Sequence, residues 1–415
     1  MGTQGRVLII VCDGMGDRPL RARRFQTPLT VAKKPNIDKL ARTASVGLMH
    51  PVGPGVSPGS DVAHLALLGY DPYESYNGRG GLEAVGAGIN MNTGDVAFRC
   101  NFATVDEKMI VKDRRAGRNP EGREDFAKVL NEIDLTARDV SFEFVPTVAH
   151  RAVLILRGGK LSHRVTDTDP HEENRAVQTS KPKDDKEESR CTAEILNEFT
   201  EKSHQALKSH RMNAERIRRG IPAANIILSR GAGTIQPIEP LTAKYCIKAA
   251  CIAVVPIVRG VCSLAGMRLI DVEGATGGLD SDFKAMAKVA ASALRENDLI
   301  FLHIKAPDIA GHSGDFDEKI RTIERIDEAI GEILKSLDLN IHYVVLTSDH
   351  ATPVTVKDHS ADPVPILIAG PDFDASNVAS FSERTAATGN LGTLFAVDLM
   401  PILMSRLGKD MKFGS

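Results

Sequence analysis

The chain has 415 residues, 42% of them hydrophobic, and 52 Lys and Arg residues nearly balance 54 Asp and Glu residues, for a formal charge of −2. This composition excludes a disordered chain, and the charge provides no global basic field for nucleic acid or anionic membranes. No stretch approaches the roughly 18 uninterrupted apolar residues that a membrane span needs. The six cysteines are scattered without a C-x-x-C pair, which is typical of reduced, buried thiols in an intracellular, cytoplasmic protein.

The chain begins with a short apolar run, Val7–Cys12, which is followed by turn residues and predicts a buried strand. The middle of the chain is less regular, and its charged run Lys181–Arg190 indicates a solvated loop or the start of a helix. The strand pattern resumes near residue 249. We therefore expect a discontinuous domain, residues 1–91 and 236–415, into which residues 92–235 are inserted as a smaller α/β domain.

Three further apolar runs follow toward the C-terminus, at Leu299–Ile304, Tyr343–Thr347 and Ile366–Ala369, each ending in turn residues. Continuous apolar strands of this kind suit a parallel sheet that is buried on both faces. Between them, Asp317–Leu337 places isoleucine and leucine at helical spacing, which predicts a helix covering the sheet. The fold class is therefore α/β, with a mostly parallel sheet flanked by helices.

Acidic residues and histidines gather after the predicted strands. In open α/β sheets, ligands bind beyond the carboxyl ends of the strands, and clustered carboxylates there require a neutralising cation. Each aspartate taken alone is equally consistent with a helix cap or a turn former. Six ligands at equivalent places suit two divalent ions, and mixed nitrogen and oxygen ligands favour manganese or zinc over magnesium. The six candidates are Asp13, Asp308, His312, Asp349, His350 and His359.

Ser60 follows Pro58-Gly59 and precedes a helix-like stretch. It is either a plain helix N-cap or a nucleophile, because a helix N-terminus stabilises an oxyanion or phosphate. A serine hydroxyl needs a base or a metal to activate it, and a neighbouring metal cluster would provide this. His64 lies four residues later on the same helix face, with packing as its alternative role.

Basic residues of the predicted insert form a third group. Arginine forks match phosphate and carboxylate oxygens, although each residue alone is equally a surface charge. The segment Arg114–Arg118 is the best local candidate because Gly117 lets the backbone approach a ligand. The glycine-rich residues 78–88 do not satisfy G-x-G-x-x-G, and no Walker A sequence is present, so we expect no nucleotide. The candidates are Arg99, Arg114, Arg115, Arg118, His150, Arg151 and Arg230, with Lys244 where the chain returns to the first domain.

Seven motifs distributed over nearly the whole chain carry a resemblance to a known family. They are Val11–Asp17, Gly59–Leu65, Gly69–Pro72, Gly78–Ala84, Ala306–His312, Ser348–His350 and His359–Pro365. Together they resemble the archaeal-type, cofactor-independent phosphoglycerate mutases of the alkaline phosphatase superfamily. The resemblance implies an alkaline-phosphatase-like, metal-binding domain and an inserted domain that binds the glycerate portion of the substrate and closes over it to exclude water.

The resemblance also implies roles for individual residues. Ser60 would be the nucleophile that carries the phosphoryl group, and Lys244 would contact that group. One metal would be held by Asp13, Ser60, Asp349 and His350, and the other by Asp308, His312 and His359. Manganese is the first expectation, with zinc, cobalt or magnesium as alternatives, and 2,3-bisphosphoglycerate is not required. Lys305 departs from the family pattern, because an acidic residue is common there, and it would either weaken metal binding or point away.

The expected function is interconversion of 3-phosphoglycerate and 2-phosphoglycerate, in glycolysis and gluconeogenesis, through a phosphoserine. The alternative is a metal-dependent phosphohydrolase or phosphotransferase that acts on another small phosphorylated metabolite with the same residues. A further alternative is a non-catalytic protein that binds a phosphorylated metabolite, although no metal ligand is missing. The expected partner is a small phosphorylated carboxylic acid, with no nucleic acid or membrane, and the oligomeric state stays open.

Overall fold

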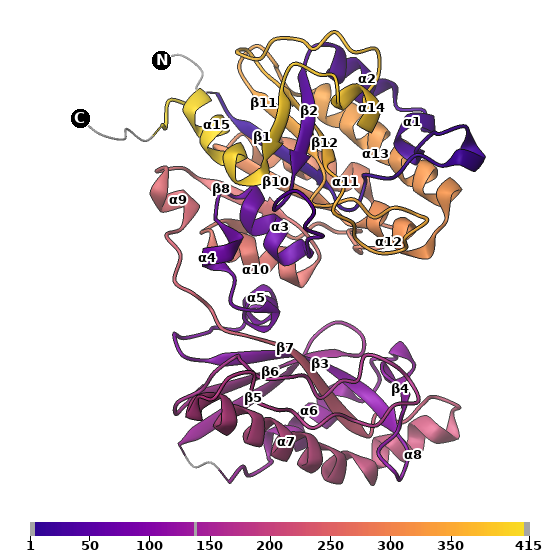
Figure 1. The fold of residues 1–415 in the computed structure, drawn as a ribbon, viewed down its shortest axis with the longest axis vertical. Helices are drawn as coiled ribbons and strands as arrows, with labels where there is room; N and C mark the ends of the chain where they lie inside the picture. Colours follow the sequence, from indigo (N-terminus) through magenta and orange to yellow (C-terminus); the bar gives the residue numbers. More distant parts are fainter. Residues whose placement is uncertain (1–4, 137–138, 411–415) are drawn as a thin grey trace. The chain divides into compact units, whose positions relative to one another are not determined.

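The computed structural model describes residues 5–136 and 139–410. The chain divides into two compact units, shown in Figure 1. Unit 1 comprises the residues up to Ser75 and those from Ile238 onward, and unit 2 comprises Tyr76–Pro237. Each unit has its own sheet and its own hydrophobic core.

Unit 1 is built on a sheet that has eight strands within the described residues. In spatial order they are β13 (Gly392–Phe395), β2 (Ser45–His50), β12 (Val364–Ala369), β11 (Tyr343–Thr347), β1 (Val7–Cys12), β10 (Leu299–Ile304), β8 (Ala249–Ile252) and β9 (Arg268–Leu269). The strands β1, β10 and β11 are buried along their whole lengths, as their continuous apolar sequences require. The predicted α/β class with a mostly parallel sheet is confirmed.

β12 differs from the parallel arrangement that its apolar sequence suggested, because it runs antiparallel to both β11 and β2. Its carboxyl end therefore lies at the opposite edge of the sheet from the carboxyl ends of β1 and β11. Its amino end, and the loop before it, lie at the edge where those two strands end. This direction brings the loop that carries His359 to that edge.

Helices cover both faces of this sheet. They are α1 (Pro28–Val31), α2 (Pro35–Arg42), α3 (Ser60–Leu67), α4 (Pro72–Ser75), α9 (Leu241–Lys244), α10 (Pro256–Leu264), α11 (Phe283–Ala293), α12 (Ala306–Ser313), α13 (Phe316–Leu334), α14 (Glu383–Ala386) and α15 (Leu399–Arg406), with short 3₁₀ turns at Arg21–Arg23 and Ala396–Asp398. The helix predicted over 317–337 is α13, and it begins where the Asp315 side chain accepts the Glu318 amide. Its isoleucines, at positions 323, 326, 330 and 333, are buried in the main core of unit 1.

Unit 2 contains a five-stranded sheet whose pairings are all antiparallel. Its strands are β3 (Val96–Val105), β4 (Val111–Asp113), β5 (Val140–Pro146), β6 (Arg151–Gly158) and β7 (Ile226–Gly233). Its helices are α5 (Arg79–Gly86), α6 (Arg123–Asn131), α7 (Glu187–Lys208) and α8 (Arg211–Arg218), with a 3₁₀ turn at Ala116–Arg118. Phe102, Phe126, Phe144 and Phe199 pack against one another in its core, with ring centroids 5.6–5.9 Å apart.

The boundary between the units lies earlier in the chain than the sequence suggested. We expected residues up to 91 in the first domain, but α5 packs on the sheet of unit 2, where Ala84 joins a core cluster with Ala97 and Val153. The glycines of this helix permit the contact, because a Cβ on Gly80 would lie 1.9 Å from the carbonyl oxygen of Ala97. The glycine-rich stretch is therefore a packing feature of unit 2.

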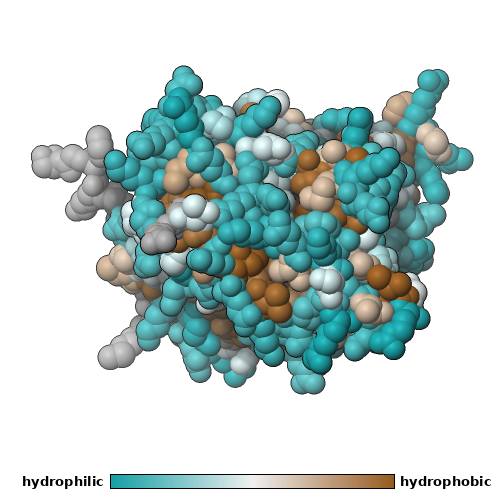
Figure 2. Space-filling model, turned by 90° about the horizontal axis from the view of Figure 1, so that it is seen from below, coloured by the Kyte–Doolittle hydropathy of each residue, from teal (hydrophilic) through white to brown (hydrophobic). Residues whose placement is uncertain are grey.

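The six cysteines are free thiols, as expected, but not all of them are buried. All six cysteines lie in the described ranges and are free thiols, but Cys246 is exposed and Cys191 is half-buried, contrary to the expectation that all are buried. No helix in residues 5–136 or 139–410 has the length and apolar character needed to cross a membrane. Figure 2 shows that hydrophobic patches on the face in view are small and separated by hydrophilic residues.

Candidate active site

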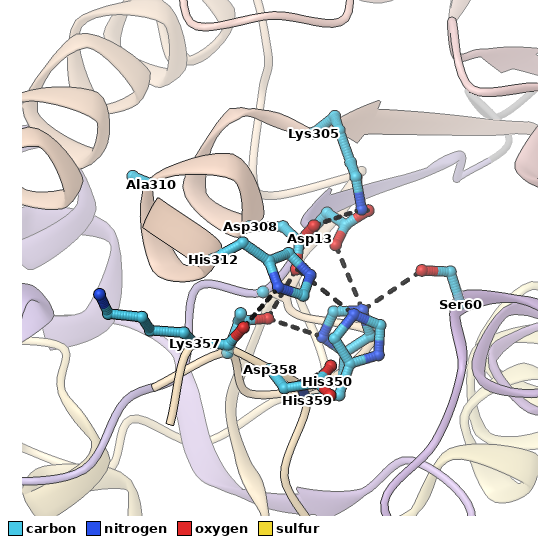
Figure 3. A network of polar contacts seen from close by, with 12 residues as sticks. Asp13, Ser60, Lys305, Asp308, Ala310, His312, His350, Lys357, Asp358 and His359 are labelled. Atoms are coloured by element: carbon cyan, nitrogen blue, oxygen red, sulfur yellow. Dashed lines mark hydrogen bonds and ion pairs between the residues drawn. The ribbon is translucent and has the colours of Figure 1, made fainter. Parts of the chain in front are cut away.

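The carboxyl ends of three neighbouring strands bring three aspartates to one place in unit 1. Asp13 directly follows β1, Asp349 lies two residues after β11, and Asp308 lies in the first turn of α12, just after β10. At most 1% of each residue is exposed. The sheet therefore gathers the three carboxylates that the strand-end argument predicted, as Figure 3 shows for Asp13 and Asp308.

His350 joins two of these carboxylates to the serine. Its Nε2 lies 3.2 Å from Asp349 Oδ2, 3.3 Å from Asp13 Oδ1 and 3.2 Å from Ser60 Oγ. Burial lowers the pKa of His350 to about 3, so the ring is neutral at physiological pH. A neutral imidazole is the form that binds a metal.

Asp308 is the centre of the second group. Its Oδ1 lies 3.4 Å from His312 Nε2 and 3.5 Å from His359 Nε2. The ring of His359 stacks on that of His350, with centroids 3.5 Å apart, so the two groups are contiguous (Figure 3). Asp358 also offers a carboxylate beside His312 and His359, a candidate ligand that our sequence analysis did not include.

The donor set fits divalent cations. Asp13 Oδ1 and Asp349 Oδ2 are buried and have no hydrogen-bond partner among the described residues. Buried carboxylate oxygens without partners are costly unless a cation or a donor satisfies them. Ligand atoms of Asp13, Asp349 and His350 lie within 4.8 Å of one another, as do those of Asp308, His350 and His359. Mixed carboxylate and imidazole donors of this kind suit manganese or zinc.

Ser60 is the first residue of α3, and the N-cap position belongs to Gly59. The alternative interpretation of Ser60 as an N-cap is therefore wrong. Its hydroxyl faces His350, and its side chain lies at the amino end of the helix, where an anion is stabilised. His64 is fully buried, and its Nδ1 lies 2.6 Å from the carbonyl oxygen of Ser60, so it fixes the first turn of the helix.

Two residues at the end of β10 enter the site although we had not assigned them to it. Lys305 Nζ lies 2.9 Å from Asp13 Oδ2 and 2.6 Å from Asp308 Oδ2, so it points into the site rather than away from it. Burial disfavours its charged form, but the two carboxylates outweigh burial and raise the pKa of Lys305. His303 Nε2 lies 2.9 Å from Asp13 Oδ2. The sequence does contain a signal for these two residues, because a histidine and a lysine stand at the end of an otherwise apolar run.

Lys244, which the resemblance placed on the phosphoryl group, ends the short helix α9 and is half-buried. Its Nζ lies 5.5 Å from the ring centroid of Tyr245. In the described part of the chain, Lys305 contacts the carboxylates of the site within 4 Å and Lys244 does not. Lys305 is thus the cation that the fold places beside them.

The basic candidates of unit 2 form one cluster. Arg99 of β3 pairs in register with Arg230 of β7, and Arg151 begins the neighbouring strand β6. Burial, then the charges of Arg151, Arg115, Arg99 and Arg118, lower the pKa of His150 to about 4, because all four cations lie near this ring. The sheet therefore brings the predicted residues together.

Two acidic residues that our sequence analysis did not assign neutralise part of this cluster. Glu83 of α5 accepts a hydrogen bond from Arg79 at 3.0 Å and lies 3.7 Å from Arg99. Asp169 accepts two hydrogen bonds from Arg114, at 2.8 and 2.7 Å. Both residues lie in segments that stand out in the sequence, Glu83 in the glycine-rich stretch 78–88 and Asp169 in the Asp-rich segment 167–171. The sequence does not show which strands these segments lie against. A hollow of about 780 Å³ beside the cluster is lined by Arg114, Arg115, Arg118 and His171, among others.

Comparisons with known proteins agree with this geometry. Residues 41–213 match a family described as 2,3-bisphosphoglycerate-independent phosphoglycerate mutase, and residues 153–365 match one described as type I phosphodiesterase / nucleotide pyrophosphatase. Proteins named 2,3-bisphosphoglycerate-independent phosphoglycerate mutase from Methanothermobacter thermautotrophicus and Methanopyrus kandleri are 45% and 46% identical, over 98% and 100% of this chain and 99% of each relative.

Solved structures give the same result. A Pyrococcus horikoshii protein superposes with a TM-score of 0.85 at 36% identity, covering 99% of this chain and 100% of the other. A cofactor-independent phosphoglycerate mutase from Thermoplasma acidophilum superposes with a TM-score of 0.70 at 34% identity, covering 97% of this chain and 100% of the other. The chain belongs to the 2,3-bisphosphoglycerate-independent phosphoglycerate mutase family.

Proposed function

We propose that this protein interconverts 3-phosphoglycerate and 2-phosphoglycerate, as a cytoplasmic enzyme of glycolysis and gluconeogenesis, through a phosphoserine on Ser60. The observation that carries the proposal is the placement of Ser60 Oγ, 3.2 Å from His350 and at the amino end of α3, beside three buried carboxylates. Family membership supports the substrate, since the curated relatives bear the name of this activity.

We assign one divalent ion to Asp13, Ser60, Asp349 and His350, and a second to Asp308, His312 and His359, with manganese as the proposed metal. Asp13 Oδ1 and Asp349 Oδ2, which have no hydrogen-bond partner among the described residues, support this assignment. When bound, the two ions would lower the pKa of the Ser60 hydroxyl and neutralise phosphoryl oxygens. Thr352 would orient one ligand of each ion, because its hydroxyl donates to Asp308 Oδ1 at 2.7 Å and lies 3.1 Å from His350 Nδ1.

In the proposed reaction, Ser60 Oγ forms a bond to phosphorus while the ester bond between phosphorus and the substrate oxygen breaks. The released glycerate oxygen takes up a proton, and the glycerate stays bound and turns. Its other hydroxyl then loses its proton and forms a bond to the phosphorus of the phosphoserine, while the bond between phosphorus and Ser60 Oγ breaks and Ser60 Oγ takes up a proton. Lys305, held between Asp13 and Asp308, is placed to stabilise the charge that spreads over the phosphoryl oxygens.

We propose that the arginine cluster of unit 2 binds the substrate carboxylate and retains the glycerate. Within the described residues, the side chains of Arg115, Arg118 and Arg151 have no carboxylate within 4 Å, so they are available to a ligand. Arg114 already forms a bidentate pair with Asp169, so we assign it a supporting role. Arg99, His150 and Arg230 complete the proposed surface.

The test is a mutase assay on purified protein, with manganese and 3-phosphoglycerate, without 2,3-bisphosphoglycerate, coupled to enolase, and with free phosphate measured in parallel. We expect formation of 2-phosphoglycerate, its loss by at least about 1,000-fold in Ser60→Ala, and no change in Ser57→Ala, an exposed serine of the same loop. EDTA should abolish the activity and manganese should restore it. Activity that survives EDTA or Ser60→Ala would refute the mechanism, and phosphate release without isomerisation would favour a phosphohydrolase.

A further inference from the structure

Arg216 of α8 is a buried cation that has no carboxylate partner within 4 Å among the described residues, and only 1% of it is exposed. Its guanidinium group donates instead to four backbone carbonyl oxygens. Nε donates to Pro222 at 3.0 Å, Nη1 to Glu121 at 2.7 Å and to Asn119 at 3.3 Å, and Nη2 to Ala116 at 2.8 Å. A buried charge is tolerated only when its donors are satisfied, so the guanidinium and these carbonyls depend on one another.

Three of the four acceptors, the carbonyls of Ala116, Asn119 and Glu121, belong to residues 115–121, the segment that displays Arg115 and Arg118. Its backbone is unusual, because Ala116, Gly117 and Arg118 are consecutive residues with φ of 43°, 69° and 55°. Left-handed conformations cost energy for residues other than glycine, and they persist only where the surroundings impose them. Asp113 supports the segment by accepting the amides of Arg115 and Gly117, both at 2.7 Å. Arg216 supports it through the carbonyl oxygens of Ala116, Asn119 and Glu121.

The direction of these contacts explains why arginine is needed. The acceptors surround a planar group whose donors point outward in a fixed fork, which a lysine ammonium cannot reproduce. The only residue of the segment buried in the core is Ala116, and its carbonyl is one of the oxygens that Arg216 holds. Without the fork, the segment keeps the Asp113 contacts but loses the restraint on Ala116, Asn119 and Glu121.

We propose that Arg216 is a positioning residue for substrate binding, which holds the 115–121 segment, with its left-handed residues 116–118, so that Arg115 and Arg118 face the cationic cluster. This inference rests on the proposed function, since it takes the cluster to be the surface that binds the substrate carboxylate. Arg115 and Arg118 line the same hollow as Arg114, whose partner Asp169 lies 3.9 Å from Arg230 of that cluster. Arg216 itself contacts backbone carbonyls and not the hollow beside the segment.

The test compares Arg216→Lys and Arg216→Met with Arg218→Met, an exposed arginine of the same helix. The first readout is the separation of KM and kcat for 3-phosphoglycerate in the manganese-loaded enzyme. We expect both Arg216 variants to raise KM at least tenfold while kcat stays within about threefold. The second readout is hydrogen exchange of residues 113–121 in the ligand-free protein, which should accelerate in both variants and not in Arg218→Met.

The two readouts separate the possible failures. If Arg216→Met does not fold, Arg216→Lys, which keeps the charge and loses the fork, provides the same comparison. Unchanged exchange and unchanged KM in Arg216→Lys would overturn the inference, as would an equal loss of kcat, which would indicate general damage. If the wild-type protein has no mutase activity, the proposed function fails. In that case faster hydrogen exchange in the Arg216 variants would still support the inference that Arg216 restrains the segment, and unchanged exchange would refute it.

Discussion

Replacing Lys319 with methionine should destabilise unit 1 strongly while leaving every proposed metal ligand in the chain. Lys319 lies on α13 and is fully buried. Its ammonium group donates to the carboxylate of Asp17 at 2.8 Å and to the carbonyl oxygens of Gly16 at 3.1 Å and Thr352 at 2.9 Å. These acceptors lie on the loops that follow β1 and β11, so one cation joins the two segments that carry Asp13 and His350.

The magnitude follows from the burial of both charges. Removing one partner of a buried ion pair leaves an uncompensated charge and costs about 3–5 kcal/mol of the free energy of unfolding. For a unit of this size, that corresponds to a fall of about 6–20 °C in Tm. The double variant Lys319→Met with Asp17→Asn should recover part of the loss. It removes both charges, and the asparagine oxygen still accepts the Val354 amide that Asp17 accepts.

The assay is thermal denaturation of the EDTA-treated protein, monitored by circular dichroism. EDTA is present so that loss of metal does not contribute to the difference in Tm. Lys335→Met is the matched control, because this residue directly follows α13 and forms an exposed pair with Glu332 at 2.7 Å. We expect no measurable loss in the control. A Lys319→Met variant as stable as Lys335→Met, or a double variant less stable than the single one, would refute the reasoning.

Thr352→Val should lower manganese affinity by about 10- to 100-fold, because it removes the hydroxyl that contacts Asp308 and His350. The check is calorimetric titration against Thr322→Val, a buried hydroxyl without a hydrogen-bond partner among the described residues, and equal affinities would contradict the prediction. Glu83→Gln should destabilise unit 2 in a pH-dependent manner. Burial opposes ionisation of Glu83, but Arg99 and Arg79 lower the pKa of this carboxyl below 4.5. Its stabilising effect is therefore fully present above pH 4.5 and is lost as pH falls through the lower folded pKa. Urea unfolding of the wild-type protein and of Glu83→Gln, above and below pH 4.5, measures the difference in their free energy of unfolding. A difference that does not change with pH would contradict this prediction.

The meeting of the three aspartates of unit 1 was predictable because it depends on the direction and adjacency of parallel strands. Parallel neighbours end at one edge, so Asp13, Asp308 and Asp349 had to meet once β1, β10 and β11 were taken as adjacent. The direction of β12 could not be derived in the same way, because an apolar run has the same composition in either orientation. Whether Lys305 points into the site depends on packing around the end of β10, which no local pattern reports.

The site of unit 2 was less accessible to sequence reasoning. Its arginines come from β3, β6 and β7, and their convergence depends on the register of antiparallel strands distant in the chain. The sequence could therefore list the basic residues of the insert as candidates but could not show that they converge. The role of Glu83 was hidden for the same reason, since it depends on α5 lying against β3 and β7. Composition also could not locate the start of the unit, because a glycine-rich stretch does not show which sheet it packs against.

The position of β1 has a consequence for synthesis of the chain. β1 pairs with β10 and β11, so Val7 lies beside Leu299 on one side and Tyr343 on the other. At about 5–20 residues per second, roughly 15–70 s pass between the translation of the first strand and that of its second neighbour. Unit 2 is continuous in sequence and can pair its strands during this time. The segment VLIIVC, uncharged and rich in β-branched residues, has no such partners. The strand at the centre of the finished sheet is thus open to aggregation on the ribosome-bound chain until both of its neighbours have been translated.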